Sequence, residues 1–282
     1  MTSARMPTFF LSHGGGPWPF MDGPWRDRCA WLERSLVDIP QHLPQRPSAV
    51  LVVSGHWEEP EFTVSSGEHP GMEYDYYGFP QEMYSIRYPA PGSPGLAQRT
   101  QQLLAQAGWD AKSDAQRGFD HGTFSLMKVM YPDADVPVVQ LSLKATLDPD
   151  EHFRAGEAIA PLRDEGVLVI GSGLSYHNLR AFGPAGEQPS ASFDAWLRTV
   201  MGEPDPRKRR QQLAHWQQAP GARASHPRED HLLPLHVVAG AAGDEPATCV
   251  YGELFAGALA VSSWRFSTDT EPSSFDRRAF AS

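Results

Sequence analysis

The sequence has few cysteines, few basic residues and no long apolar run. Its two cysteines, Cys29 and Cys249, are far apart, so we expect no disulfide framework, no thiolate metal site, and a reducing, cytoplasmic location. With 24 basic and 34 acidic residues the formal charge is −10, which argues against nucleic acid or an anionic membrane as a partner. The basic cluster 207–210 is interpreted as a solvated helix face. No apolar run reaches the roughly 18 residues of a membrane-spanning helix, and the N-terminus does not resemble a signal sequence.

Histidine is the unusually abundant polar residue, with 11 copies, and several copies follow predicted strands. A short apolar run rich in β-branched residues and closed by a turn signal is typical of a buried parallel strand. Three segments have this form: 8–12 followed by His13 and three glycines, 49–53 followed by Ser54-Gly55 and His56, and 166–170 followed by Gly171-Ser172-Gly173 and, shortly after, His177. Ligands of open α/β sheets bind at the carboxyl ends of the strands, so this pattern predicts a site there.

Apolar strands alternate with helical segments along the whole chain, which predicts an α/β fold. We expect one domain spanning residues 1–282, with a central, mostly parallel sheet and helices on both faces. Further strands are predicted at 136–143, 249–251 and 258–266. Helices are predicted at 25–36, 96–108, 124–131, 150–165, 193–201, 206–216 and 232–242.

Five histidines lie at strand ends or helix starts and are the candidates for a common site: His13, His56, His121, His177 and His231. Neutral imidazole binds iron, zinc and copper, and such sites need three or four ligands from separate elements. His236 is expected in the core or supporting a ligand. The other histidines in loops or on polar helix faces are expected at the surface: His42, His69, His152, His215 and His226.

A long segment rich in proline, glycine and tyrosine, 58–94, separates the second predicted strand from the next helix. Loops of this length inside a compact domain tend to be functional. Its aromatic residues either line a pocket or hold the segment against the core, and for most of them we favour the second interpretation.

Motifs along nearly the whole chain resemble those of the class III (LigB-like) extradiol ring-cleavage dioxygenases, in the DOPA-dioxygenase-type branch. They occur in the family's order: LSHGGGP, VVSGHW, YYGFP, YPAPGSP, FDHGTF with YPDADVPVVQLSL, GSGLSYHNL and EDHLLPLHVVAGAAG. The resemblance implies a catechol substrate, O2 and a non-haem Fe(II), with cleavage of the ring next to its two hydroxyls.

The resemblance also assigns roles to the candidate histidines. It implies that His13, His56 and His231 are the metal ligands. His177 is implied to be the catalytic base or a further ligand in zinc-loaded members, and His121 a residue that contacts the substrate.

Better-known relatives use a glutamate as third ligand, whereas this sequence has His231 there, as its own branch does. Asp230 adjoins it, but a neighbour on a helix is expected to point elsewhere. Because an all-histidine site resembles catalytic zinc sites, Zn(II) is an alternative to Fe(II). Two rival functions remain: a zinc hydrolase in which His177 or Glu58 activates water, and a non-catalytic metal-binding protein. We expect a monomer or a small homo-oligomer.

Overall fold

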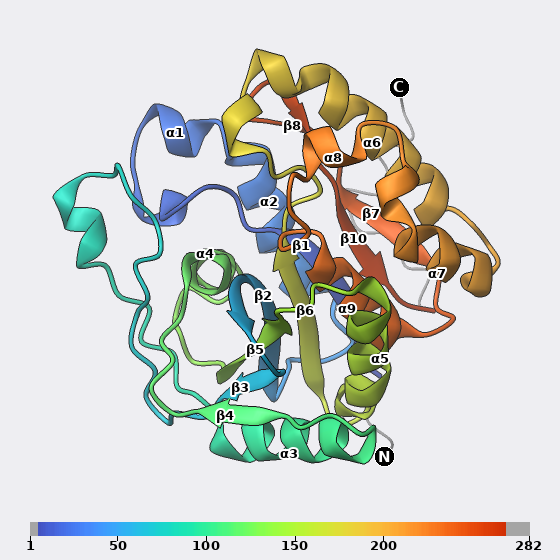
Figure 1. The fold of residues 1–282 in the computed structure, drawn as a ribbon. Helices are drawn as coiled ribbons and strands as arrows, with labels where there is room; N and C mark the ends of the chain where they lie inside the picture. The colour runs from blue at the N-terminus through green and yellow to red at the C-terminus, as the bar shows by residue number, and fades with distance from the viewer. Residues whose placement is uncertain (1–4, 269–282) are drawn as a thin grey trace.

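A computed structural model describes residues 5–268, and its main feature is an eight-stranded sheet in the order β4-β3-β5-β2-β6-β1-β10-β7 (Figure 1). The four central strands β5, β2, β6 and β1 pair in parallel, and β10 and β7 extend the sheet in antiparallel pairing. The strands are β1 Thr8–Ser12, β2 Ala49–Glu59, β3 Thr63–Ser65, β4 Lys112–Asp114, β5 Val138–Lys144, β6 Val167–Gly173, β7 Ala247–Tyr251 and β10 Ser263–Phe266, with a separate pair of β8 Leu254–Phe255 and β9 Leu259–Ala260.

Alternate residues of the central strands are buried on opposite faces, and helices cover both faces (Figure 1). On β2, Val50 and Val52 pack towards α2 and α4, while Leu51 and Val53 pack towards α3, α5, α6, α7 and α9. The helices are α1 Pro24–Asp27, α2 Ala30–Asp38, α3 Pro94–Gln106, α4 His121–Met130, α5 Pro149–Ile159, α6 Glu187–Met201, α7 Pro206–Ala214, α8 Ala222–Ser225 and α9 Leu233–Ala242. The predicted fold class, a mostly parallel sheet with helices on both faces, is therefore confirmed.

The strand β2 differs from its prediction. It does not end before Ser54-Gly55 but continues to Glu59, so His56 lies within the strand rather than after it. Its pairing with β5 is irregular there: Val53 lies opposite Leu141 and Glu58 opposite Leu143. The extra residues on β2 form a bulge, a device that re-aims side chains near active sites.

Other differences are local. The predicted helix 25–36 is divided into α1 and α2, and the two short strands β3 and β4 were not predicted. Both strands have only three residues, too few for a periodic signal.

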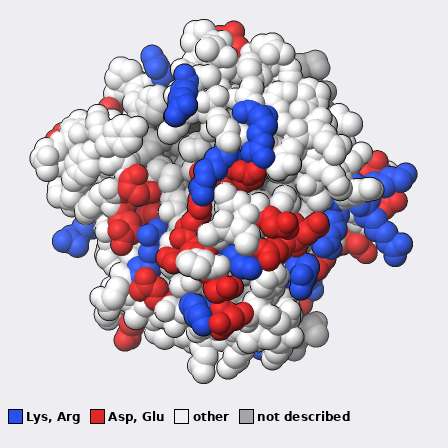
Figure 2. Space-filling view, in the orientation of Figure 1, with Lys and Arg blue, Asp and Glu red and all other residues white. Residues whose placement is uncertain are grey.

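The basic cluster on α7 is not a purely solvated face. Arg209 is buried and donates to the carbonyl oxygen of Glu245, while Arg210 pairs with Glu157. In Figure 2 the basic side chains over α7, at the right of the view, stand among acidic ones. No helix within residues 5–268 is long and apolar enough to cross a membrane.

Candidate metal centre

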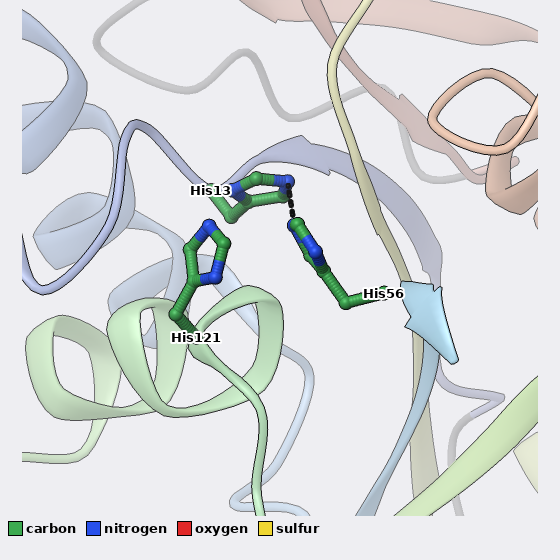
Figure 3. A group of neighbouring side chains, drawn as sticks. All are labelled: His13, His56 and His121. Atoms are coloured by element: carbon green, nitrogen blue, oxygen red, sulfur yellow. Dashed lines mark hydrogen bonds between the residues drawn. The ribbon is translucent and has the colours of Figure 1, made fainter. Parts of the chain in front are cut away.

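The structure brings His13 and His56 together near the carboxyl ends of β1 and β2, which lie on either side of β6. His13 follows β1, whose end is tied to β6 by a hydrogen bond from the His13 backbone N–H to the carbonyl oxygen of Gly173, 3.2 Å long. The Nε2 atoms of His13 and His56 are 3.3 Å apart (Figure 3). The Nε2 atom of His231 lies 3.0 Å from that of His56, so the Nε2 atom of His56 is close to those of both other imidazoles.

This donor set fits a metal ion. Two nitrogens bound at about 2.0–2.1 Å to one metal are separated by about 3.0 Å at right angles and about 3.4 Å in a tetrahedron. The observed separations of 3.3 and 3.0 Å lie in that interval. Burial also holds the pKa values of His13, His56 and His231 well below the usual range, reinforced by neighbouring histidines, so the imidazoles are neutral as metal ligands must be.

The backbone around His231 can approach the other histidines because β2 and β6 have glycine where this backbone packs against them. A Cβ on Gly173 would lie 2.1 Å from the carbonyl oxygen of His231, and one on Gly55 would lie 3.1 Å from that of Asp230. The amide of Leu174 also donates to the carbonyl oxygen of His231, 3.1 Å away. Glycine at these two positions therefore leaves room for the segment that carries His231 to pack against the ends of β2 and β6.

Asp230 does not point away from the site, contrary to the prediction. It lies in the turn before α9, not in a helix, and its Oδ2 is 2.7 Å from Nδ1 of His231. A carboxylate behind the His231 ring fixes the orientation of the ring and leaves Nε2 facing His56.

His177 lies against His231 on the turn after β6. The two rings are stacked, with centroids 3.3 Å apart and planes 14° apart. The turn is anchored, because the His177 amide donates to the carbonyl oxygen of Ser225 at 2.9 Å. Burial lowers the pKa of His177 to about 4, opposed by the nearby charge of Asp230, so the ring is neutral near pH 7.

His121 begins α4, and its ring faces those of His13 and His56, with centroids 5.1 and 4.0 Å away (Figure 3). The helix is capped by Asp120, whose Oδ1 accepts from the Thr123 amide at 3.0 Å. The same oxygen accepts from the Ser54 hydroxyl at 2.9 Å, which ties the helix start to the strand that carries His56. Asp120 is thus the N-cap of α4.

All five candidate histidines therefore gather at one place. The sequence reasoning missed two carboxylates that contact them, Asp230 and Asp75. Asp75 lies in the segment 58–94, called the tyrosine-rich segment below, and nothing in its spacing indicated that it would reach the histidines.

The remaining histidines divide between surface and core. His42, His69 and His215 are exposed, as expected. His152 and His226 are wholly buried, which contradicts the prediction. His152 binds backbone groups at the start of α5 through both ring nitrogens, and His226 binds the carbonyl oxygen of Ser175, near the His177 turn, through Nε2. His236 lies in the core, with its ring nitrogens 3.3 and 3.0 Å from the carbonyl oxygens of Leu232 and Leu213.

The tyrosine-rich segment is held by its own hydroxyls, as favoured for most of its aromatic residues. Tyr74 donates to the carbonyl oxygen of Ile86 at 2.8 Å, and Tyr88 to that of Tyr131 at 2.8 Å. Tyr77 is the exception, with 87% of its surface exposed.

Aromatic rings pack directly against the glycines that follow His13. The Cβ positions of Gly14 and Gly16, both at positive φ, would lie 2.4 and 2.5 Å from atoms of Trp18 and Phe79. Their lack of a side chain therefore allows close packing beside His13.

Glu58 is held by Arg228 in a two-pronged ion pair, and one of its contacts is 2.6 Å long. The pair joins the end of β2 to the segment that precedes His231. A carboxylate engaged in this way is poorly suited to activate water, which disfavours the role that Glu58 would have in a zinc hydrolase.

Comparison with known proteins gives a consistent picture. The family described as the catalytic LigB subunit of aromatic ring-opening dioxygenase matches residues 7–261. Proteins named 4,5-DOPA dioxygenase extradiol are similar: the one from Portulaca grandiflora is 38% identical over 275 residues, covering 93% of this chain and 96% of its own, and the one from Escherichia coli K12 is 38% identical over 268 residues, covering 93% and 95%. The crystal structure of an uncharacterized protein from Escherichia coli K12 superimposes with a TM-score of 0.73 at 33% identity, covering 93% of this chain and 100% of that one.

Proposed function

Because the chain belongs to the LigB family of catalytic subunits of aromatic ring-opening dioxygenases, we propose that its reaction takes place at one metal ion bound by His13, His56 and His231. The reaction class follows from the family and from the relatives: the chain is an extradiol dioxygenase, which opens an aromatic ring with O2. The observation that carries the ligand set is the approach of the Nε2 atoms of His13 and His231 to that of His56, within 3.3 and 3.0 Å.

We propose Fe(II) as the working metal, with Zn(II) able to occupy the same ligands. The reaction class supports this choice, because ring opening with O2 requires a redox-active metal and zinc has no redox chemistry. Fe(II) would supply open coordination positions for the two catechol oxygens and for O2, and it would lower the pKa of the phenol.

The residues around the ligands have separate proposed tasks. His177, neutral and stacked on His231, would accept a phenolic proton as the catechol binds. His121, whose ring faces that of His56, would hold a substrate oxygen. Phe79, whose ring lies against Gly16, would help to exclude water.

The substrate is proposed to be a catechol with a side chain, of the kind named for the relatives, DOPA. We also propose that residues 1–282 form one catalytic domain, since every described strand except the β8–β9 pair joins one sheet. The protein is proposed to act in the cytoplasm as a monomer or a small homo-oligomer; the buried, unpaired Cys29 and Cys249 support a reducing compartment.

The test is anaerobic reconstitution of the metal-free protein with Fe(II), followed by air and a panel of catechols. We expect a yellow ring-fission product with at least one catechol, and none with zinc-loaded protein. Equal product formation by His56→Ala, at matched iron content, would contradict the proposed site.

A further inference from the structure

One carboxylate faces two of the five histidines at once. Oδ1 of Asp75 is 2.9 Å from Nδ1 of His121 and also accepts from the His121 backbone N–H at 3.0 Å. Its other oxygen, Oδ2, is 3.1 Å from Nδ1 of His56. Asp75 thus lies behind a proposed metal ligand and behind the proposed substrate-contacting residue.

The contacts determine which ring nitrogen of each histidine is available. An ionised carboxylate only accepts hydrogen bonds, so each facing Nδ1 is favoured as the protonated nitrogen. An imidazole that carries its single proton on Nδ1 has its lone pair on Nε2. For His56 this is the atom that lies 3.3 and 3.0 Å from the Nε2 atoms of His13 and His231.

Asp75 is held in place by its two neighbours in the chain. Tyr74 donates its hydroxyl to the carbonyl oxygen of Ile86 at 2.8 Å, and Tyr76 donates to that of Met83 at 2.5 Å. The Tyr76 ring also lies edge-on to His121, with centroids 5.9 Å apart. The carboxylate is therefore delivered by the tyrosine-rich segment and not by the sheet.

We propose that Asp75 is a positioning residue that sets the tautomer and orientation of His56 and His121 together. The tyrosine-rich segment thereby couples the metal ligand to the residue on the substrate side. This inference rests on the proposed function, because it takes His56 to be a metal ligand. Carboxylates that hold a metal-binding histidine in this way are worth about 10–100-fold in metal affinity.

Asparagine in place of Asp75 separates this role from simple packing. The Asn side chain has nearly the same shape, but its NH2 group can only donate, so it cannot serve both Nδ1–H groups. One of the two rings must move its proton to Nε2 or turn away. If the ring is His56, the nitrogen that should bind the metal is blocked.

The first experiment titrates metal-free protein with Zn²⁺ against a chelator. We expect Asp75→Asn to bind Zn²⁺ about 10–100-fold more weakly than the wild type, and Asp75→Glu, which keeps two acceptors, to recover part of that loss. Glu82→Gln is the matched control, because Glu82 lies exposed in the same segment and its carboxylate contacts no histidine among the described residues. It should bind as the wild type does.

The second experiment reads the tautomers directly by ¹⁵N NMR of the imidazoles. In the wild type we expect His56 and His121 to carry their protons on Nδ1, and in Asp75→Asn at least one of them to carry it on Nε2. An Nε2–H form of His56 in the wild type overturns the inference even if Asp75→Asn fails to fold.

The results also separate this inference from the proposed function. If His56→Ala loses Zn²⁺ while Asp75→Asn keeps wild-type affinity and tautomers, the positioning role is wrong and the ligand set stands. If His56→Ala binds Zn²⁺ as the wild type does, His56 is no ligand, and both proposals fall.

Discussion

Replacing His177 by alanine tests the division of labour between metal ligands and base. The backbone at this position is held by the bond from its amide to the carbonyl oxygen of Ser225, 2.9 Å long, so losing the ring should leave the turn in place. His231 keeps its carboxylate partner Asp230 at 2.7 Å. What His231 loses is the ring stacked on it at 3.3 Å.

These contacts give the expected magnitudes. A lost ring–ring contact is worth about 0.5–1.5 kcal/mol, so metal affinity should fall by no more than about tenfold. A positioned base contributes about 10²–10⁴-fold, so kcat should fall by that factor, about 2.7–5.4 kcal/mol in barrier height. The fall in kcat exceeds the fall in metal affinity in this way only if His177 is a base and not a ligand.

The assay is an anaerobic Fe(II) titration of His177→Ala beside single-turnover formation of the ring-fission product. His215→Ala is the control, since His215 is an exposed histidine whose Nδ1 faces the carbonyl oxygen of Gln211, and it should match the wild type in both measurements. A fall in iron affinity of about a thousandfold would refute the reasoning and make His177 a ligand.

Three further predictions follow from the same geometry. His13→Ala should abolish metal retention after dialysis, measured by elemental analysis, with far-UV circular dichroism unchanged; full metal occupancy would contradict the ligand set. Gly173→Ala should weaken Zn²⁺ binding by more than about tenfold, because its Cβ would lie 2.1 Å from the His231 carbonyl oxygen, whereas Gly95→Ala, with nothing within 4 Å, should not. Burial lowers the pKa of His152 to about 4 from 6.5, so the unfolded chain binds more protons than the folded chain between these pH values. The folding stability that depends on neutral His152 is therefore complete above pH 6.5 and is lost as the pH falls to 4. His152→Gln should reduce that loss by up to about 3 kcal/mol in urea unfolding at pH 7 and pH 4, and an unchanged loss would show that His152 does not cause it.

The central sheet was predictable because its strands are buried on both faces. The run 49–53 is uniformly apolar, and the structure uses its alternate residues for opposite faces. The bulge beyond Val53 was not predictable, because Ser54-Gly55 is equally typical of a turn. Glycine is needed there for the close approach of Asp230, a contact made across the fold and invisible in local sequence.

The site was predictable in its histidines and not in their partners. His13, His56 and His177 follow apolar runs that belong to adjacent strands, so the topology alone brings them to one edge. Asp75 reaches His121 from 46 positions away in a segment without periodic structure, and no spacing rule indicates such a contact. His152 and His226 were misassigned because polar flanking residues conceal that their rings bind backbone groups in the core.

The central claim is that Fe(II) held by His13, His56 and His231 opens the ring of a catechol with O2. The most direct measurement follows bound iron, O2 consumption and yellow product in the same sample. The account predicts one O2 consumed for each catechol opened, in proportion to the iron bound and with no turnover by the zinc-loaded protein. Ring opening that is independent of iron content, or equal with zinc, would contradict it.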